Sequence, residues 1–172
     1  MIKILKQDTL KRDDAFSSSA PVNVTDIVSG IISDVAARGD KALYEYCEKF
    51  DKGKLDSLQV TPEEIEEALS LVEPRFIEIL KTAADNIRAF HEKQVRTSFI
   101  INDRPGIVMG QKVIPVDRAG LYVPGGTAAY PSTVLMDAIP AKIAGVPEVV
   151  MVSPPGADGK INPVILAAAA IA

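Results

Sequence analysis

From Ala119 to its last residue, the chain alternates short apolar strands with helices, and the links between them are short. Residues 119–123 and 148–152 have the length and composition of buried strands, whereas residues 132–144 and the segment after Asn162 have helical spacing. A strand–helix–strand order with short links predicts a βαβ unit, with parallel strands and a right-handed crossover. This pattern restricts the second part of the chain to an α/β fold.

Charge is distributed unevenly along the 172 residues. Of the 42 charged residues, 34 precede Pro105, whereas 9 of the 12 prolines lie from Pro105 onward. The first part therefore resembles solvated amphipathic helices, and the second part resembles buried structure with tight turns. The expected fold class is α/β, with a helical N-terminal part followed by strands and the start of the βαβ unit.

Four helices are expected in the first part, because apolar residues recur there at helical spacing. They begin near Val24, Asp40, Pro62 and Pro74. Asn23 can cap the first helix, and Gly39 can end it. Thr61, Pro62 and Glu64 supply the third helix with a cap, a first-turn proline and a capping-box glutamate.

Three further strands are expected, two between these helices and the βαβ unit and one between the second and third helices. Residues 98–101 and 107–113 are apolar runs on either side of an Asn-Asp-Arg-Pro-Gly turn, which predicts a hairpin. Residues 58–60 are expected to form a short strand before the third helix.

Composition excludes several classes of protein. The net charge is −4, so no basic excess points to nucleic acid or to an anionic membrane. Cys47 is the only cysteine, which rules out a disulfide within the chain and is compatible with a reducing compartment. The first residues lack the apolar core of a signal peptide, and the longest apolar run, Val164–Ala172, is too short to span a bilayer. We therefore expect a cytoplasmic protein. Because the sequence stops inside that apolar run, we also expect it to be part of a longer protein that has been cut short.

The strongest candidate site is the loop of residues 124–132, which follows one strand and precedes a helix. Ligands of open α/β sheets bind at the carboxyl ends of strands, and the adjacent Gly125 and Gly126 permit a close approach to the backbone. Ser132 or Thr133 can cap the helix or bond a ligand. A purely structural turn explains the same residues equally well. Neither standard phosphate-binding glycine motif is present.

Other candidates are weaker. Tyr122 can stack on a planar ligand, although its strand position favours a core tyrosine. Asp117 and Arg118 can pair with each other or reach a ligand. His91 ends a charged helix and is read as structural, and Cys47 lies on an apolar helix face, which favours a buried thiol over a nucleophile. These residues do not make a complete catalytic set.

Several motifs, in order along nearly the whole chain, resemble histidinol dehydrogenase. Residues 120–126 read GLYVPGG, residues 130–136 read YPSTVLM, and residues 140–146 read PAKIAGV. Shorter matches are RGD at residues 38–40, KFD at 49–51, NI at 86–87, FHEKQ at 90–94 and SPP at 153–155.

The resemblance implies an enzyme that oxidises L-histidinol to L-histidine through L-histidinaldehyde, with two NAD molecules used in succession. It also implies one zinc per subunit that holds the substrate, a glutamate–histidine pair that handles protons, and a homodimer whose subunits exchange terminal segments. The expected domains are an N-terminal arm (residues 1–20), the mostly helical start of a first α/β domain (21–118), and the start of a second, Rossmann-like NAD-binding domain (119–172).

Few of the family's site residues fall within this sequence. Tyr122 matches a tyrosine that contacts NAD, Gly125 and Gly126 belong to the same cofactor loop, and Ser132 matches a serine of the substrate pocket. The resemblance places no catalytic residue and no zinc ligand here, so these 172 residues are expected to be inactive by themselves. The alternative is a stand-alone module that binds a nucleotide or a partner without catalysis.

Overall fold

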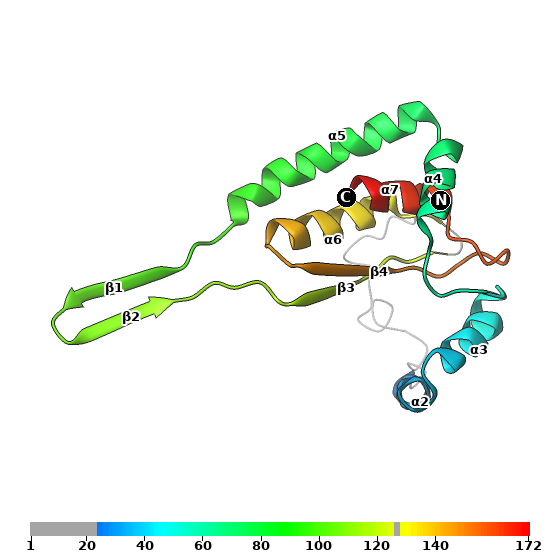
Figure 1. Ribbon diagram of the computed structural model, residues 1–172, viewed down its shortest axis with the longest axis horizontal. Helices are drawn as coiled ribbons and strands as arrows, with labels where there is room; N and C mark the ends of the chain where they lie inside the picture. The colour runs from blue at the N-terminus through cyan, green and yellow to red at the C-terminus, as the bar shows by residue number, and fades with distance from the viewer. Residues whose placement is uncertain (1–23, 126–127) are drawn as a thin grey trace, which may run out of the picture. The chain divides into compact units, whose positions relative to one another are not determined.

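The computed structural model describes residues 24–125 and 128–172 (Figure 1). Contacts divide the chain into two units, one that ends at Leu43 and one from Tyr44 to Ala172. The expected N-terminal arm, residues 1–20, and the expected cap Asn23 lie outside the described residues. No described helix has the length and apolar character needed to cross a membrane.

The first unit contains helix α2 (Val24–Arg38) and the start of α3 (Asp40–Asp51). Gly39 separates the two helices with a φ of 60°, a conformation that glycine adopts easily, so its predicted role as a helix stop is confirmed. None of the residues of α2 is buried, and its apolar residues Val24, Ile27 and Ile32 are all exposed.

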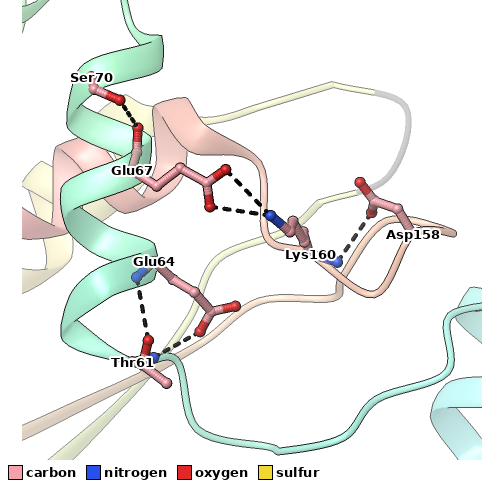
Figure 2. Close-up of polar contacts among 6 residues, drawn as sticks. All are labelled: Thr61, Glu64, Glu67, Ser70, Asp158 and Lys160. Carbon is pink, nitrogen blue, oxygen red and sulfur yellow. Dashed lines mark hydrogen bonds and ion pairs between the residues drawn. The ribbon is translucent and has the colours of Figure 1, made fainter.

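The second unit begins with the rest of α3, followed by α4 (Pro62–Leu71), α5 (Pro74–His91) and the 3₁₀ turn η2 (Glu92–Gln94). The predicted capping box of α4 is confirmed and visible in Figure 2. The N–H of Thr61 donates to Glu64 Oε2 at 2.7 Å, and the N–H of Glu64 donates to Thr61 Oγ1 at 3.3 Å. The strand predicted at residues 58–60 is wrong: the segment is irregular, because the N–H of Gln59 bonds to the Ser57 hydroxyl at 3.1 Å instead of a neighbouring strand.

The predicted hairpin is confirmed as β1 (Phe99–Arg104) and β2 (Ile107–Gln111), which pair antiparallel. Gly106 supplies the positive φ of the turn, 77°. Every residue of both strands is exposed. The hairpin therefore presents apolar side chains to solvent on both of its faces.

The predicted βαβ unit is also confirmed. Strand β3 (Arg118–Tyr122) and strand β4 (Glu148–Val152) are parallel, and α6 (Pro131–Ile143) connects them. Helix α7 (Pro163–Ile171) follows, and its cap Asn162 accepts a hydrogen bond from the N–H of Val164 at 2.9 Å. The fold class is thus α/β, with a helical first part followed by strands.

The core of the second unit lies between the helices and one face of the β3–β4 sheet. Helix α6 contacts both strands and packs on α5 and α7, while α7 packs on α4, α5 and α6. The core cluster comprises Leu80, Ala84, Val123, Val134, Leu135, Ile139, Ile165 and Ala168. On the sheet, Leu121 and Met151 are partly buried and Met151 packs against this core, whereas Tyr122 and Val152 on the opposite face are exposed.

Candidate functional site

Tyr122 lies at the carboxyl end of β3, on the face of the sheet that the helices leave uncovered. It is 65% exposed, and its neighbour across the ladder, Val152, is 59% exposed. The interpretation of Tyr122 as a core tyrosine is therefore wrong, because the strand turns this position away from α6. Its aromatic ring is accessible to a ligand at the sheet edge.

The first residue after β3, Val123, is held in place by burial and by a backbone hydrogen bond. Val123 is fully buried, and its N–H donates to Val152 O at 2.9 Å, which extends the ladder one residue beyond the strand. A Cβ at Gly125 would lie 3.0 Å from the carbonyl oxygen of Pro154. Position 125 therefore leaves little space for a side chain, because a second loop packs against its backbone. Gly126, the other predicted loop glycine, lies outside the described residues.

Ser132 is the second residue of α6 and does not cap it. The helix begins one residue earlier, at Pro131, with Tyr130 as the N-cap and no side-chain hydrogen bond to the first turn. The Ser132 side chain is exposed and makes no hydrogen bond to another described residue. The interpretation of Ser132 as a cap is wrong, because Pro131 suits the first helical position and moves the cap to Tyr130. Its hydroxyl remains available to a ligand.

Pro154 is the residue that sequence reasoning missed at this edge. It follows β4, and a Cβ at Gly125 would lie 3.2 Å from its Cγ and 3.4 Å from its Cδ. The available signal was the Pro154-Pro155 pair one residue after the strand, where a rigid backbone adjoins the carboxyl edge of the sheet.

Beyond Pro154, the β4–α7 loop makes a tight turn over residues 156–160. The N–H of Gly156 donates to Lys160 O at 2.8 Å, and the N–H of Lys160 donates to Asp158 Oδ1 at 3.0 Å. Lys160 Nζ also pairs with Glu67 Oε2 on α4 at 3.1 Å (Figure 2). The turn is thereby tied to the helical part of the same unit.

The remaining candidate site residues do not lie at the carboxyl edge of the β3–β4 sheet. Arg118 pairs with Glu148 on β4, so Asp117 is not its partner. His91 shares a 2.7 Å hydrogen bond with Gln94, a local contact at the end of α5. Burial raises the pKa of the Cys47 thiol, and the nearby Asp51 raises it further, so the thiolate form is disfavoured and the prediction of an inert buried thiol is supported.

The arrangement is suited to binding rather than to proton transfer. Residues 123–132 contain no Asp, Glu, His, Lys or Arg, so an acid or base for catalysis would have to come from elsewhere. Among the described residues, no three His, Cys, Asp or Glu side chains are grouped so that they could hold a metal. Among its described residues, the site offers the accessible ring of Tyr122, the loop glycine Gly125 and the Ser132 hydroxyl.

A model of the histidinol dehydrogenase family matches residues 15–172. Histidinol dehydrogenase of Clostridium acetobutylicum is 48% identical over the whole chain, which covers 41% of that protein. The Bacillus subtilis histidinol dehydrogenase is 50% identical over 83% of the chain and 34% of its own length. The crystal structure of histidinol dehydrogenase from Elizabethkingia anophelis superposes with a TM-score of 0.85 and 36% identity, over 90% of this chain and 36% of that one. The chain thus spans about two fifths or less of these relatives.

Proposed function

The chain belongs to the histidinol dehydrogenase family, and we propose that it forms the N-terminal part of an enzyme that oxidises L-histidinol to L-histidine through L-histidinaldehyde with NAD. Its own contribution is one edge of the NAD and substrate site. The observation that carries this proposal is the exposed ring of Tyr122 at the carboxyl end of β3, where a Rossmann-like βαβ unit receives its nucleotide.

Three described residues are suited to hold the two ligands. The Tyr122 ring would hold a planar part of NAD, and Gly125 would let the dinucleotide approach the backbone there. Ser132 bonds the substrate through its hydroxyl. NAD, when bound, would supply the oxidising power: converting a primary alcohol to an acid through the aldehyde uses two NAD molecules and one water, with one hydride transferred to each NAD.

The zinc and the proton-transferring residues are proposed to come from outside these 172 residues. No described cluster suits zinc, and the loop at the sheet edge has no acidic or basic side chain. We also propose that the complete enzyme is a cytoplasmic homodimer, as the family resemblance implies. Residues 1–172 alone are then expected to bind NAD weakly or not at all and not to oxidise histidinol.

The experiment uses a composite enzyme, meaning residues 1–172 joined to the remaining C-terminal part of the Clostridium acetobutylicum relative. The composite enzyme is expected to form NADH only when both histidinol and NAD are present. The isolated 172-residue chain is expected to form none. A composite enzyme that unfolds cooperatively yet forms no NADH from histidinol contradicts the proposal. Tight NAD or protein binding by the isolated chain would favour the stand-alone module instead.

A further inference from the structure

Two loops meet at the carboxyl edge of the β3–β4 sheet, and they touch at Gly125 and Pro154. The three heavy atoms nearest to a Cβ built on Gly125 all belong to Pro154: the carbonyl oxygen at 3.0 Å, Cγ at 3.2 Å and Cδ at 3.4 Å. The proline ring and carbonyl thus form the wall against which the glycine backbone rests. Few other residues would present such a rigid wall, because the pyrrolidine ring fixes φ.

The loop that carries Pro154 is itself braced at its far end. A Cβ on Gly53 would lie 2.7 Å from Gly156 O, and a Cβ on Gly159 would lie 2.8 Å from Lys54 O. Backbone therefore packs directly on backbone at both contacts, with no room for a side chain. The Lys160–Glu67 ion pair adds a third attachment, to α4. Pro154 consequently extends from a segment with little freedom to move.

We propose that Pro154 is a positioning residue for the NAD site, which fixes the backbone at Gly125, close in sequence to Tyr122. This inference rests on the proposed function. Pro154 does not itself touch NAD. Its role is to hold the backbone of Gly125 in the position that NAD approaches. Less conformational entropy of this backbone is then lost when NAD binds.

The test compares Pro154→Ala with Pro155→Ala in the composite enzyme. Both variants replace one proline of the same loop, but only Pro154 supplies the atoms nearest to Gly125. Pro154→Ala is expected to raise the KM for NAD about fivefold while kcat and the KM for histidinol change less than about twofold. Pro155→Ala is expected to leave all three constants within about twofold, and thermal midpoints report any general loss of stability.

A double variant separates positioning from general stability. Gly125→Ala is expected to raise the KM for NAD at least about tenfold, because the Pro154 carbonyl belongs to the backbone and yields little. If both residues act through one contact, Gly125→Ala with Pro154→Ala raises the KM no further than Gly125→Ala alone. The inference would be overturned if Pro154→Ala and Pro155→Ala raised the KM for NAD equally. It would also be overturned if the KM of the double variant rose by the product of the two single-variant factors. An inactive but folded parent enzyme would overturn the proposed function instead.

Discussion

Arg118 and Glu148 face each other at the first rung of the parallel β3–β4 ladder and form an ion pair of 2.7 Å. The pair lies at the amino end of β3, whereas Tyr122 lies at the carboxyl end of the same strand. Both charged side chains are at least half exposed. Arg118 is therefore engaged with the neighbouring strand, at the end of the sheet away from the candidate site.

The first prediction concerns this ion pair. Arg118→Met is expected to change the free energy of unfolding of the composite enzyme by less than about 1 kcal/mol, because exposed ion pairs are weak. The KM for NAD is expected to stay within about twofold. Urea unfolding and steady-state kinetics measure the two quantities, and Glu148→Gln is the matched control. If Arg118→Met raised the KM for NAD tenfold and Glu148→Gln did not, Arg118 would have to be counted among the residues that bind NAD.

Tyr122 gives the second prediction. Tyr122→Ala in the composite enzyme is expected to weaken NAD binding about tenfold, because the loss of an aromatic stack on a base costs about 1–3 kcal/mol. Zinc content, measured by atomic absorption, is expected to stay unchanged. Tyr122→Phe keeps the ring and should retain most of the affinity. Unchanged NAD affinity in the alanine variant would remove Tyr122 from the site.

The cap of α4 gives the third prediction. Thr61→Ala removes the hydroxyl that accepts from the N–H of Glu64, and it is expected to lower the free energy of unfolding by about 1 kcal/mol. Ser70→Ala is the control, since that hydroxyl only donates to Glu67 O within the same helix (Figure 2). Chemical denaturation of both variants measures the difference. Equal losses in the two variants would mean that the capping box contributes no special stability.

The fourth prediction follows from the raised pKa of the Cys47 thiol. The folded chain keeps this proton at a pH where the unfolded chain, with its ordinary pKa of 9.0, has lost it. The resulting stability is present below pH 9.0 and falls as pH rises from there through the folded pKa. At pH 8, native Cys47 is expected to react with a chromogenic disulfide at least about tenfold more slowly than in urea. Equal rates would contradict its burial, and Asp51→Asn tests the smaller, charge-dependent contribution.

The exposed hairpin gives the fifth prediction. Val108 is 74% exposed, and Ile100 on the same face of the hairpin is 76% exposed. Because exposed apolar strands tend to pair with other chains, the isolated 172-residue chain is expected to self-associate through β1 and β2. Val108→Lys should raise the monomer fraction in light scattering at a fixed concentration. Leu71→Lys makes the same change at an exposed position of α4 and should have little effect. An equal gain from both variants would point to added charge rather than to the hairpin.

Local signals in the sequence predicted much of this fold. The Thr61-Pro62 start of α4, the glycine stop at Gly39 and the strands of the βαβ unit depend on short-range chemistry, and all three are confirmed. The family resemblance carried by residues 120–126 and 130–136 is confirmed as well. The strand expected at residues 58–60 failed because strand formation needs a partner, and there the backbone bonds locally instead.

The candidate site was harder to predict, because its geometry depends on contacts between distant residues. Which face of β3 carries Tyr122 was decided by the position of α6, which sequence spacing does not give. The contact between Gly125 and Pro154 joins loops that follow different strands. Of the two roles considered for Ser132, the cap is wrong because the proline before it shifts the start of the helix by one residue.

The most direct test of the account is the rate of NADH formation from histidinol and NAD by the composite enzyme. Turnover is expected from the purified composite enzyme, with two NADH formed per histidinol consumed, and none is expected from residues 1–172 alone. A folded composite enzyme without histidinol-dependent NADH formation, or turnover by the 172-residue chain by itself, would contradict the account.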